Sequence, residues 1–138
     1  MVRAVHPDRH TEFVCRSDRD LPEGEQTVFF VRPFTVLERR KVIDAIDSAG
    51  TKGAKVSIGQ LPDEVFRAGV AGWRNLLDAD DVEIEPEMGG KCPFTTREVI
   101  TDAAMERVPA TVRQEIAEHL METEIAKSAG LSEADRGN

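Results

Sequence analysis

Two histidines near the N-terminus are the first residues whose type and spacing could support chemistry. His6 and His10 lie four positions apart, and on a helix this spacing would place both rings on one face for a metal ion. Pro7 lies between them, however, and no HExxH signature follows. We therefore interpret residues 1–10 as a flexible arm, with metal binding as the alternative.

The densest group of ionisable side chains is the acidic segment Asp78-Ala-Asp-Asp-Val-Glu-Ile-Glu85. An EF-hand calcium loop starting here would need glycine at its sixth position and glutamate at its twelfth, where the chain has Glu83 and Gly89. Val82 and Ile84 alternate with the acidic residues, which predicts a short edge strand. Its exposed acidic face suits a basic partner, and an adventitious cation site is the alternative.

The other candidates for chemistry are one histidine and two cysteines. His119 lies beside an apolar stripe, and no motif links it to a nucleophile, so we interpret it as a structural histidine and not as a catalytic base. Cys15 and Cys92 have no paired-motif spacing, which predicts free thiols in a reducing cytoplasm. We predict no catalytic residue, no metal ligand and no cofactor. A small metal-dependent enzyme that uses these histidines or carboxylates is the alternative.

Composition limits the partners that the chain can bind. Its 138 residues suit one domain, and its net charge of −8 argues against sequence-independent binding of nucleic acid, which requires a basic surface. A local basic patch at Arg32, Arg39, Arg40 and Lys41 is possible, although on a helix such residues usually form a solvated face. The sequence has no apolar run of membrane-spanning length and no signal-peptide core. We expect neither a nucleic-acid partner nor a membrane partner.

The segment that must position the acidic residues contains the only tryptophan. Pro62, Asp63 and Glu64 are typical of a helix start. Apolar residues then recur at intervals of three and four up to Leu77, which predicts one amphipathic helix with Trp73 on its buried face. We interpret Trp73 as a core anchor, and a hot spot for partner binding is the alternative.

The first half of the chain shows two further patterns. Residues 12–16 and 27–32 are rich in β-branched and aromatic side chains, which predicts two antiparallel strands. Thr35 and Glu38 have capping-box spacing, which predicts a helix that continues to about Ala49.

In the second half, residues 86–94 contain Met88-Gly-Gly90 and predict a mobile linker. Capping-box spacing at Thr95 predicts a helix that Pro109 ends, and a last helix should run from about Ala110 to Ser128 with Gly130 as its C-cap. A polar tail at 131–138 completes the chain.

Together these elements predict an α+β fold in a single domain over residues 1–138. An N-terminal antiparallel β-hairpin and a short edge strand should pack against about four α-helices.

Several blocks of the sequence resemble one group of known proteins. They are Ser17-Asp-Arg-Asp-Leu-Pro-Glu-Gly-Glu-Gln-Thr27, Arg32-Pro-Phe-Thr35, Arg67-Ala-Gly-Val-Ala-Gly-Trp-Arg-Asn-Leu-Leu-Asp-Ala-Asp80, Val108-Pro-Ala-Thr-Val-Arg-Gln-Glu-Ile-Ala-Glu-His119 and Leu131-Ser-Glu-Ala-Asp-Arg-Gly-Asn138. These blocks, about half of the chain, are similar to small proteins from the morphogenesis gene clusters of tailed bacteriophages. Such proteins tend to carry a glycine in the turn after the acidic pair, where this chain has Asp81-Val82.

The resemblance implies a non-enzymatic protein made in the infected host cytoplasm. It implies a minor virion component of the head–tail or tail region, or alternatively a tail assembly chaperone that is absent from the mature virion. Other phage structural proteins would be its partners, and a homo-oligomer or ring is expected within the assembly. From the residues themselves we expect the contacts to involve Trp73, Asp78, Asp80, Asp81, Glu83 and Glu85.

Overall fold

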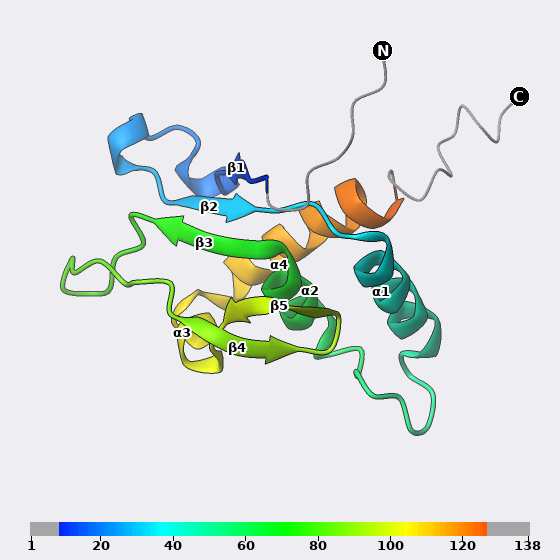
Figure 1. Ribbon diagram of the computed structural model, residues 1–138. Helices are drawn as coiled ribbons and strands as arrows, with labels where there is room; N and C mark the ends of the chain where they lie inside the picture. Colours follow the sequence, from blue (N-terminus) through cyan, green and yellow to red (C-terminus); the bar gives the residue numbers. More distant parts are fainter. Residues whose placement is uncertain (1–8, 127–138) are drawn as a thin grey trace, which may run out of the picture.

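Strands from distant parts of the sequence form the first sheet. The computed structural model describes residues 9–126, and its first sheet contains, in order, β1 (Thr11–Phe13), β2 (Val28–Val31) and β3 (Val70–Arg74). All neighbours are antiparallel (Figure 1). Phe29 on the central strand lies opposite both Phe13 and Trp73. The predicted antiparallel hairpin is confirmed. Its connection contains two 3-10 turns, η1 (Arg16–Asp18) and η2 (Glu23–Glu25).

The tryptophan segment is a short helix followed directly by a strand. The helix α2 (Leu61–Gly69) ends where β3 begins. The backbone N–H of Arg32 donates to the carbonyl of Gly69 at 2.9 Å, and its Nε donates to the carbonyl of Ala68 at 3.2 Å. These donors satisfy the last helical carbonyls, so the chain leaves the helix and pairs with β2. The prediction of one helix up to Leu77 is therefore wrong beyond Gly69.

A second sheet replaces the predicted linker and the start of the predicted third helix. It is the antiparallel pair β4 (Met88–Cys92) and β5 (Thr95–Ile100). The prediction of a mobile linker at 86–94 and of a helix starting at Thr95 is therefore wrong. Thr95 and Ile100 belong to a run rich in β-branched residues, which favours the strand, and the helix starts only after it. Its actual N-cap is Thr101, whose side chain accepts from the N–H of Ala104.

The helices α1 (Val36–Ser48), α3 (Asp102–Arg107) and α4 (Ala110–Leu120) complete the fold, and α4 continues as a π-helical segment, η3 (Met121–Ala126). The predicted capping box of α1 is present, with both reciprocal hydrogen bonds between Thr35 and Glu38. The α+β class with four α-helices is thus confirmed. The predictions for residues 1–8, Ser128, Gly130 and the tail at 131–138 lie outside the described residues.

The core lies where both sheets meet α2 and α4 (Figure 1). Its fully buried large side chains come from six elements and from the C-cap residue that follows α3: Phe29, Val42, Val65, Phe66, Val70, Val99, Ile100, Val108, Ile116 and Leu120. Gly69 allows α2 and α4 to approach closely, because a Cβ there would lie 2.5 Å from Cδ1 of Leu120. Leu120 on α4 therefore packs directly against the backbone of α2 at this position.

A buried ion pair joins α1 to β5. Glu38 is 4% exposed, and Arg97 donates to its two oxygens from Nε at 2.8 Å and from Nη2 at 2.5 Å. The hydroxyl of Thr95 donates to the same carboxylate. Burial opposes ionisation of Glu38, but the bonds from Arg97 and Thr95 outweigh it and hold the pKa of Glu38 below its ordinary value of 4.5.

Other arginines also connect elements inside the molecule. Arg67 is 6% exposed, its Nη1 lies 2.9 Å from Oδ1 of Asp102, and its Nη2 donates to the carbonyl of Ile100 at 3.2 Å. Arg32 is also buried, and Arg39 donates from Nε to the carbonyl of Glu124 at 3.0 Å. Because Arg32 points inward, the possible surface patch of Arg32, Arg39, Arg40 and Lys41 does not form as one group.

Replacing Gly90 by alanine should destabilise the protein. The new Cβ would overlap the carbonyl oxygen of Ile100 on the paired strand and lie 2.7 Å from Nη2 of Arg67. We expect the free energy of unfolding to fall by about 1–3 kcal/mol, measured by urea denaturation followed by tryptophan fluorescence. Gly24→Ala is the control, because nothing lies within 4 Å of its Cβ, and its effect should stay within about 0.5 kcal/mol. Equal stability of the two variants would contradict the pairing of β4 with β5.

Glu38→Gln should lower stability at neutral pH and remove part of its dependence on acid. The folded pKa of Glu38 is below 4.5, so its charge stabilises the fold above that pH, and this contribution is lost as the pH falls through the folded pKa. We expect the free energy of unfolding to fall by about 1.5–3 kcal/mol at pH 7. The difference in this free energy between the variant and wild type should shrink as the pH falls below 4.5. Urea denaturation across this pH range measures both. Glu106→Gln, at an exposed site on α3, is the control, and a gap independent of pH would refute the assignment.

Candidate functional site

The predicted acidic contact residues gather in the loop that joins β3 to β4. This loop projects at the left end of the molecule, beyond the ends of both strands (Figure 1). It contains all five predicted carboxylates, which are Asp78, Asp80, Asp81, Glu83 and Glu85. All of them except the partly buried Asp78 are exposed, and no lysine or arginine occurs between residues 78 and 87. We call residues 77–85 the acidic loop.

Asp78 gives the tip of the acidic loop a fixed shape. Its Oδ1 accepts from the backbone N–H groups of Asp80 at 2.8 Å and Val82 at 3.0 Å, and its own N–H donates to the carbonyl of Val82 at 2.9 Å. The N–H groups of Val82 and Asp80 hold the pKa of Asp78 below its ordinary value. Asp81 lies in the left-handed region, with φ of 60°, which aspartate tolerates better than most residues.

This turn explains why the predicted edge strand at 82–85 does not form. The bonds to Asp78 reverse the chain within a few residues, so only a single bridge pairs Leu77 with Glu83. Ile84 adds one backbone bond, donating to the carbonyl of Leu76 at 2.7 Å. The segment is therefore a tight loop, and the prediction of a strand there is wrong.

Trp73 supports the base of the acidic loop from inside. It is 4% exposed, and its ring packs edge-on against Phe29 with centroids 6.0 Å apart. Its indole N–H donates to the carbonyl of Ile84 at 2.8 Å. The structure therefore places Trp73 in the core, where its ring is not available to a partner. It acts on the acidic loop indirectly, because its hydrogen bond to Ile84 holds in place the segment that returns from the tip of the loop.

Asn75 joins the acidic loop to the β1–β2 connection. It has a φ of 61°, and its Nδ2 donates to the carbonyls of Gln26 at 3.1 Å and Gly24 at 3.2 Å. Its backbone N–H donates to Oε1 of Glu83 at 2.9 Å. The base of the loop is thus fixed from two sides, which limits the conformations available to the tip.

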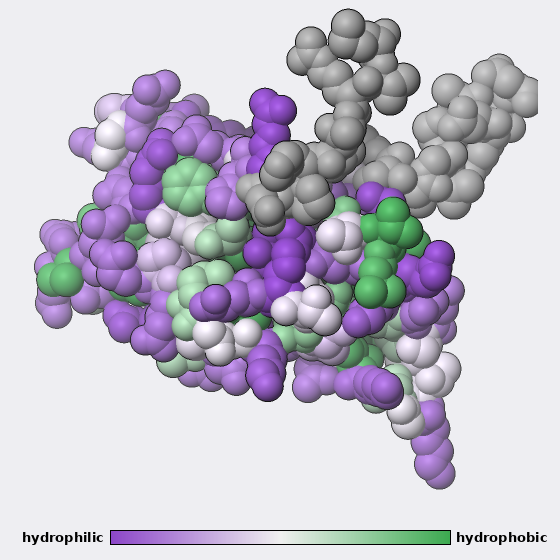
Figure 2. Space-filling model, in the orientation of Figure 1, coloured by the Kyte–Doolittle hydropathy of each residue, from purple (hydrophilic) through white to green (hydrophobic). Residues whose placement is uncertain are grey.

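Two apolar side chains stand among the carboxylates. Leu77 is 45% exposed and Val82 is 59% exposed. Figure 2 shows hydrophobic atoms at the left tip of the molecule, surrounded by hydrophilic ones. Apolar contact area with charges around it is suited to binding another protein. The exposure of Leu77 is not predicted from the sequence, because a continuous helix would bury this side chain. The turn-forming residues from Asp78 to Asp81 were the available signal.

The remaining candidates for chemistry lie apart from this loop. His119 is partly buried, and its ring lies 4.6 Å from that of Phe13, which fits a structural role. Cys15 and Cys92 are buried free thiols, as predicted, and burial raises the pKa of each to about 12. His10 is exposed, whereas His6 lies outside the described residues, so the metal pair remains untested.

Residues 9–126 show neither a cluster of metal ligands nor a membrane-spanning helix. No group of three or more histidine, cysteine, aspartate or glutamate side chains in this range is placed to hold a metal ion. No helix in the same range is long and apolar enough to cross a membrane.

Comparisons with models of protein families, with curated proteins and with solved structures each gave no match to this chain. The function is therefore inferred from the residues and from the geometry of the acidic loop.

Asp78→Ala should loosen the acidic loop without unfolding the protein. The change removes the acceptor for the N–H groups of Asp80 and Val82, so we expect their amide hydrogen exchange to accelerate roughly tenfold or more. The free energy of unfolding should change little, because the loop is at the surface. Asp80→Ala removes the same charge from an exposed residue and should leave exchange at Val82 unchanged. Equal exchange in both variants would show that Asp78 does not shape the loop.

Proposed function

We propose that the protein is a non-enzymatic component of tailed-bacteriophage morphogenesis that works through contacts with other proteins. The leading candidate role is a minor virion component of the head–tail or tail region. The acidic loop carries this proposal, because it presents Leu77 and Val82 among carboxylates on a backbone that is already fixed. A preformed loop loses little conformational entropy when a partner binds, which favours a binding role.

The chain departs from the phage morphogenesis proteins at Asp81-Val82, and the conformation of Asp81 is compatible with that departure. These proteins tend to carry glycine at this turn, and a φ of 60° is one that glycine adopts without strain. The same turn geometry would therefore suit both sequences. In this chain the position is occupied by aspartate, which adds a charge to the loop.

Two of the similar blocks also pack against one another. Gly69, in the block around Trp73, lies against Leu120, which directly follows the block that ends at His119. Both blocks contribute buried residues to the same core, among them Trp73 from the first and Ile116 from the second, and this core lies beneath the base of the acidic loop.

A second candidate is a tail assembly chaperone, and the surface around α1 favours it. Val36 and Leu37 at the start of α1 are 67% and 56% exposed, and Ile58 is 65% exposed. Figure 2 shows hydrophobic atoms over the right side of the molecule as well as at the left tip. Small apolar areas of this kind suit a partner that binds reversibly and leaves.

Mass spectrometry of purified virions separates the two roles. A virion component predicts peptides of this chain at a stoichiometric level in particles of the phage that encodes it. A chaperone predicts abundant protein in infected cells and none in particles. The proposal as a whole would be overturned if deletion of the gene changed neither particle yield nor particle structure.

Changing the acidic loop tests whether it is the contact surface. Leu77→Ser with Val82→Ser should reduce incorporation into particles, or yield of tails for a chaperone, because both side chains are exposed contact candidates. Leu21→Ser is the matched control, since Leu21 is 41% exposed on the β1–β2 connection. Equal losses for both variants would argue against the acidic loop as the contact surface.

A further inference from the structure

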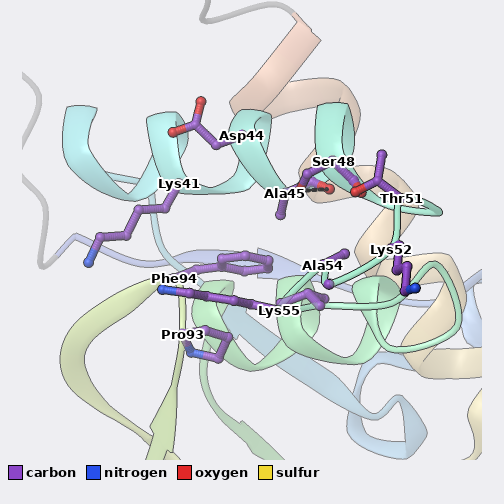
Figure 3. Close-up of a pocket in the computed structure, with 12 residues that line it drawn as sticks. Lys41, Asp44, Ala45, Ser48, Thr51, Lys52, Ala54, Lys55, Pro93 and Phe94 are labelled. Carbon is purple, nitrogen blue, oxygen red and sulfur yellow. Dashed lines mark hydrogen bonds between the residues drawn. The ribbon is translucent and has the colours of Figure 1, made fainter.

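A groove lies between α1 and the chain that follows it. The groove has a volume of about 680 Å³, which lies within the range of about 300–1,000 Å³ that is usual for binding pockets. Figure 3 shows the ring of Phe94 beneath α1, between the helix and the loop at residues 51–56. The apolar part of the lining consists of Ala45, Ala54, Val56, Pro93 and Phe94.

Lysines surround this apolar lining. Three of them, Lys41, Lys52 and Lys55, line the groove, and the only acidic residue in the lining is Asp44. In Figure 3 the side chains of Lys41 and Lys55 extend toward one end of the groove and that of Lys52 lies at the other end, while the carboxylate of Asp44 points away. We call this site the lysine groove.

The lysine groove is exceptional in the charge distribution of the chain. The protein carries a net charge of −8, and residues 9–126 contain one lysine besides these three, Lys91. Several arginines are engaged in internal contacts, such as those of Arg67 and Arg97 with carboxylates. An acidic ligand with an apolar side chain is therefore the ligand that the groove would attract.

We propose that the lysine groove binds the acidic loop of a second copy of this chain. The loop supplies what the groove lacks: carboxylates at Asp80, Asp81 and Glu85 to face the lysines, and Val82, 59% exposed, to enter the apolar part. The inference rests on the proposed function for the role of the acidic loop as a binding surface, and it adds the partner and the receiving site.

The positions of the two surfaces determine how copies would join. The acidic loop lies at the left end of the molecule, and α1 with the chain that follows it lies at the right end (Figure 1). One molecule therefore cannot place its own loop in its own groove. A contact between two different surfaces joins copies head to tail, which gives an open row or a closed ring.

Two charge-reversal variants test the pairing. The groove variant is Lys41→Glu/Lys52→Glu/Lys55→Glu, and the loop variant is Asp80→Lys/Glu85→Lys; apart from the partly exposed Lys41, all the changed residues are exposed. In sedimentation velocity, wild type should grow in mass with concentration, and less so at high salt. Each variant alone should have a Kd for self-association at least about tenfold higher than wild type.

Mixing the two variants gives the decisive result. The groove variant retains a normal loop and the loop variant retains a normal groove, and the reversed loop and reversed groove also carry opposite charges, so an equimolar mixture should associate more tightly than either variant alone. Arg9→Glu/Arg16→Glu/Lys91→Glu and Glu98→Lys/Glu106→Lys are charge-matched controls at exposed positions elsewhere, and both should associate as wild type does. Circular dichroism of every variant should match wild type.

Three outcomes would overturn the inference. The first is that wild type remains monomeric at all concentrations. The second is that the mixture associates no more than either variant alone. The third is that the loop variant alone still associates through the groove, which would mean that another segment binds there. Monomeric wild type together with its presence in virions would reject the inference and leave the proposed function standing. If the mixed variants associate but the protein has no role in phage assembly, the inference stands and the proposed function is rejected.

Discussion

The fold depends on two hydrogen bonds from Arg32, which take the place of further helical hydrogen bonds at the end of α2. Arg32 donates to the carbonyls of Gly69 and Ala68, so the last helical acceptors are satisfied by the residue that follows β2 and not by a further helical turn. The chain therefore continues as β3, which places Trp73 opposite Phe29 and brings the following loop to the end of the sheet. Gly69 makes this possible, because a side chain there would collide with Leu120 on α4. Without these two hydrogen bonds, the pairing of β2 with β3 and the support of the acidic loop by Trp73 would both be lost.

Local patterns predicted those elements whose stabilising partners are close in sequence. The hairpin of β1 and β2 and the capping box of α1 are of this kind, and so is the amphipathic α4. The tryptophan segment was mispredicted because its apolar spacing fits a helix, whereas the bonds that end the helix come from Arg32, more than thirty residues earlier. Met88-Gly-Gly90 has little intrinsic preference for a strand and becomes one only by pairing with β5. Thr95 and Glu98 have the spacing of a capping box, but the hydroxyl of Thr95 donates to the carboxylate of Glu38, which is distant in the sequence.

The candidate site was predicted in composition but not in shape. Sequence analysis selected the five carboxylates, and the structure brings them into one loop. It could not show that Asp78 turns inward to organise the backbone while its neighbours face outward, since this depends on bonds within the folded turn. The lysine groove could not be anticipated either, because Lys41 and Lys55 become neighbours only when the chain after α1 folds back beside Phe94.

The separation of the two charged surfaces gives any row of copies a direction. One end would display an unoccupied lysine groove and the other an unoccupied acidic loop, so the two termini of the row are chemically different. A single foreign protein that covers only one of these surfaces would stop growth from that side and leave the opposite side free. The length of such an assembly could then be set by a terminator present in very few copies.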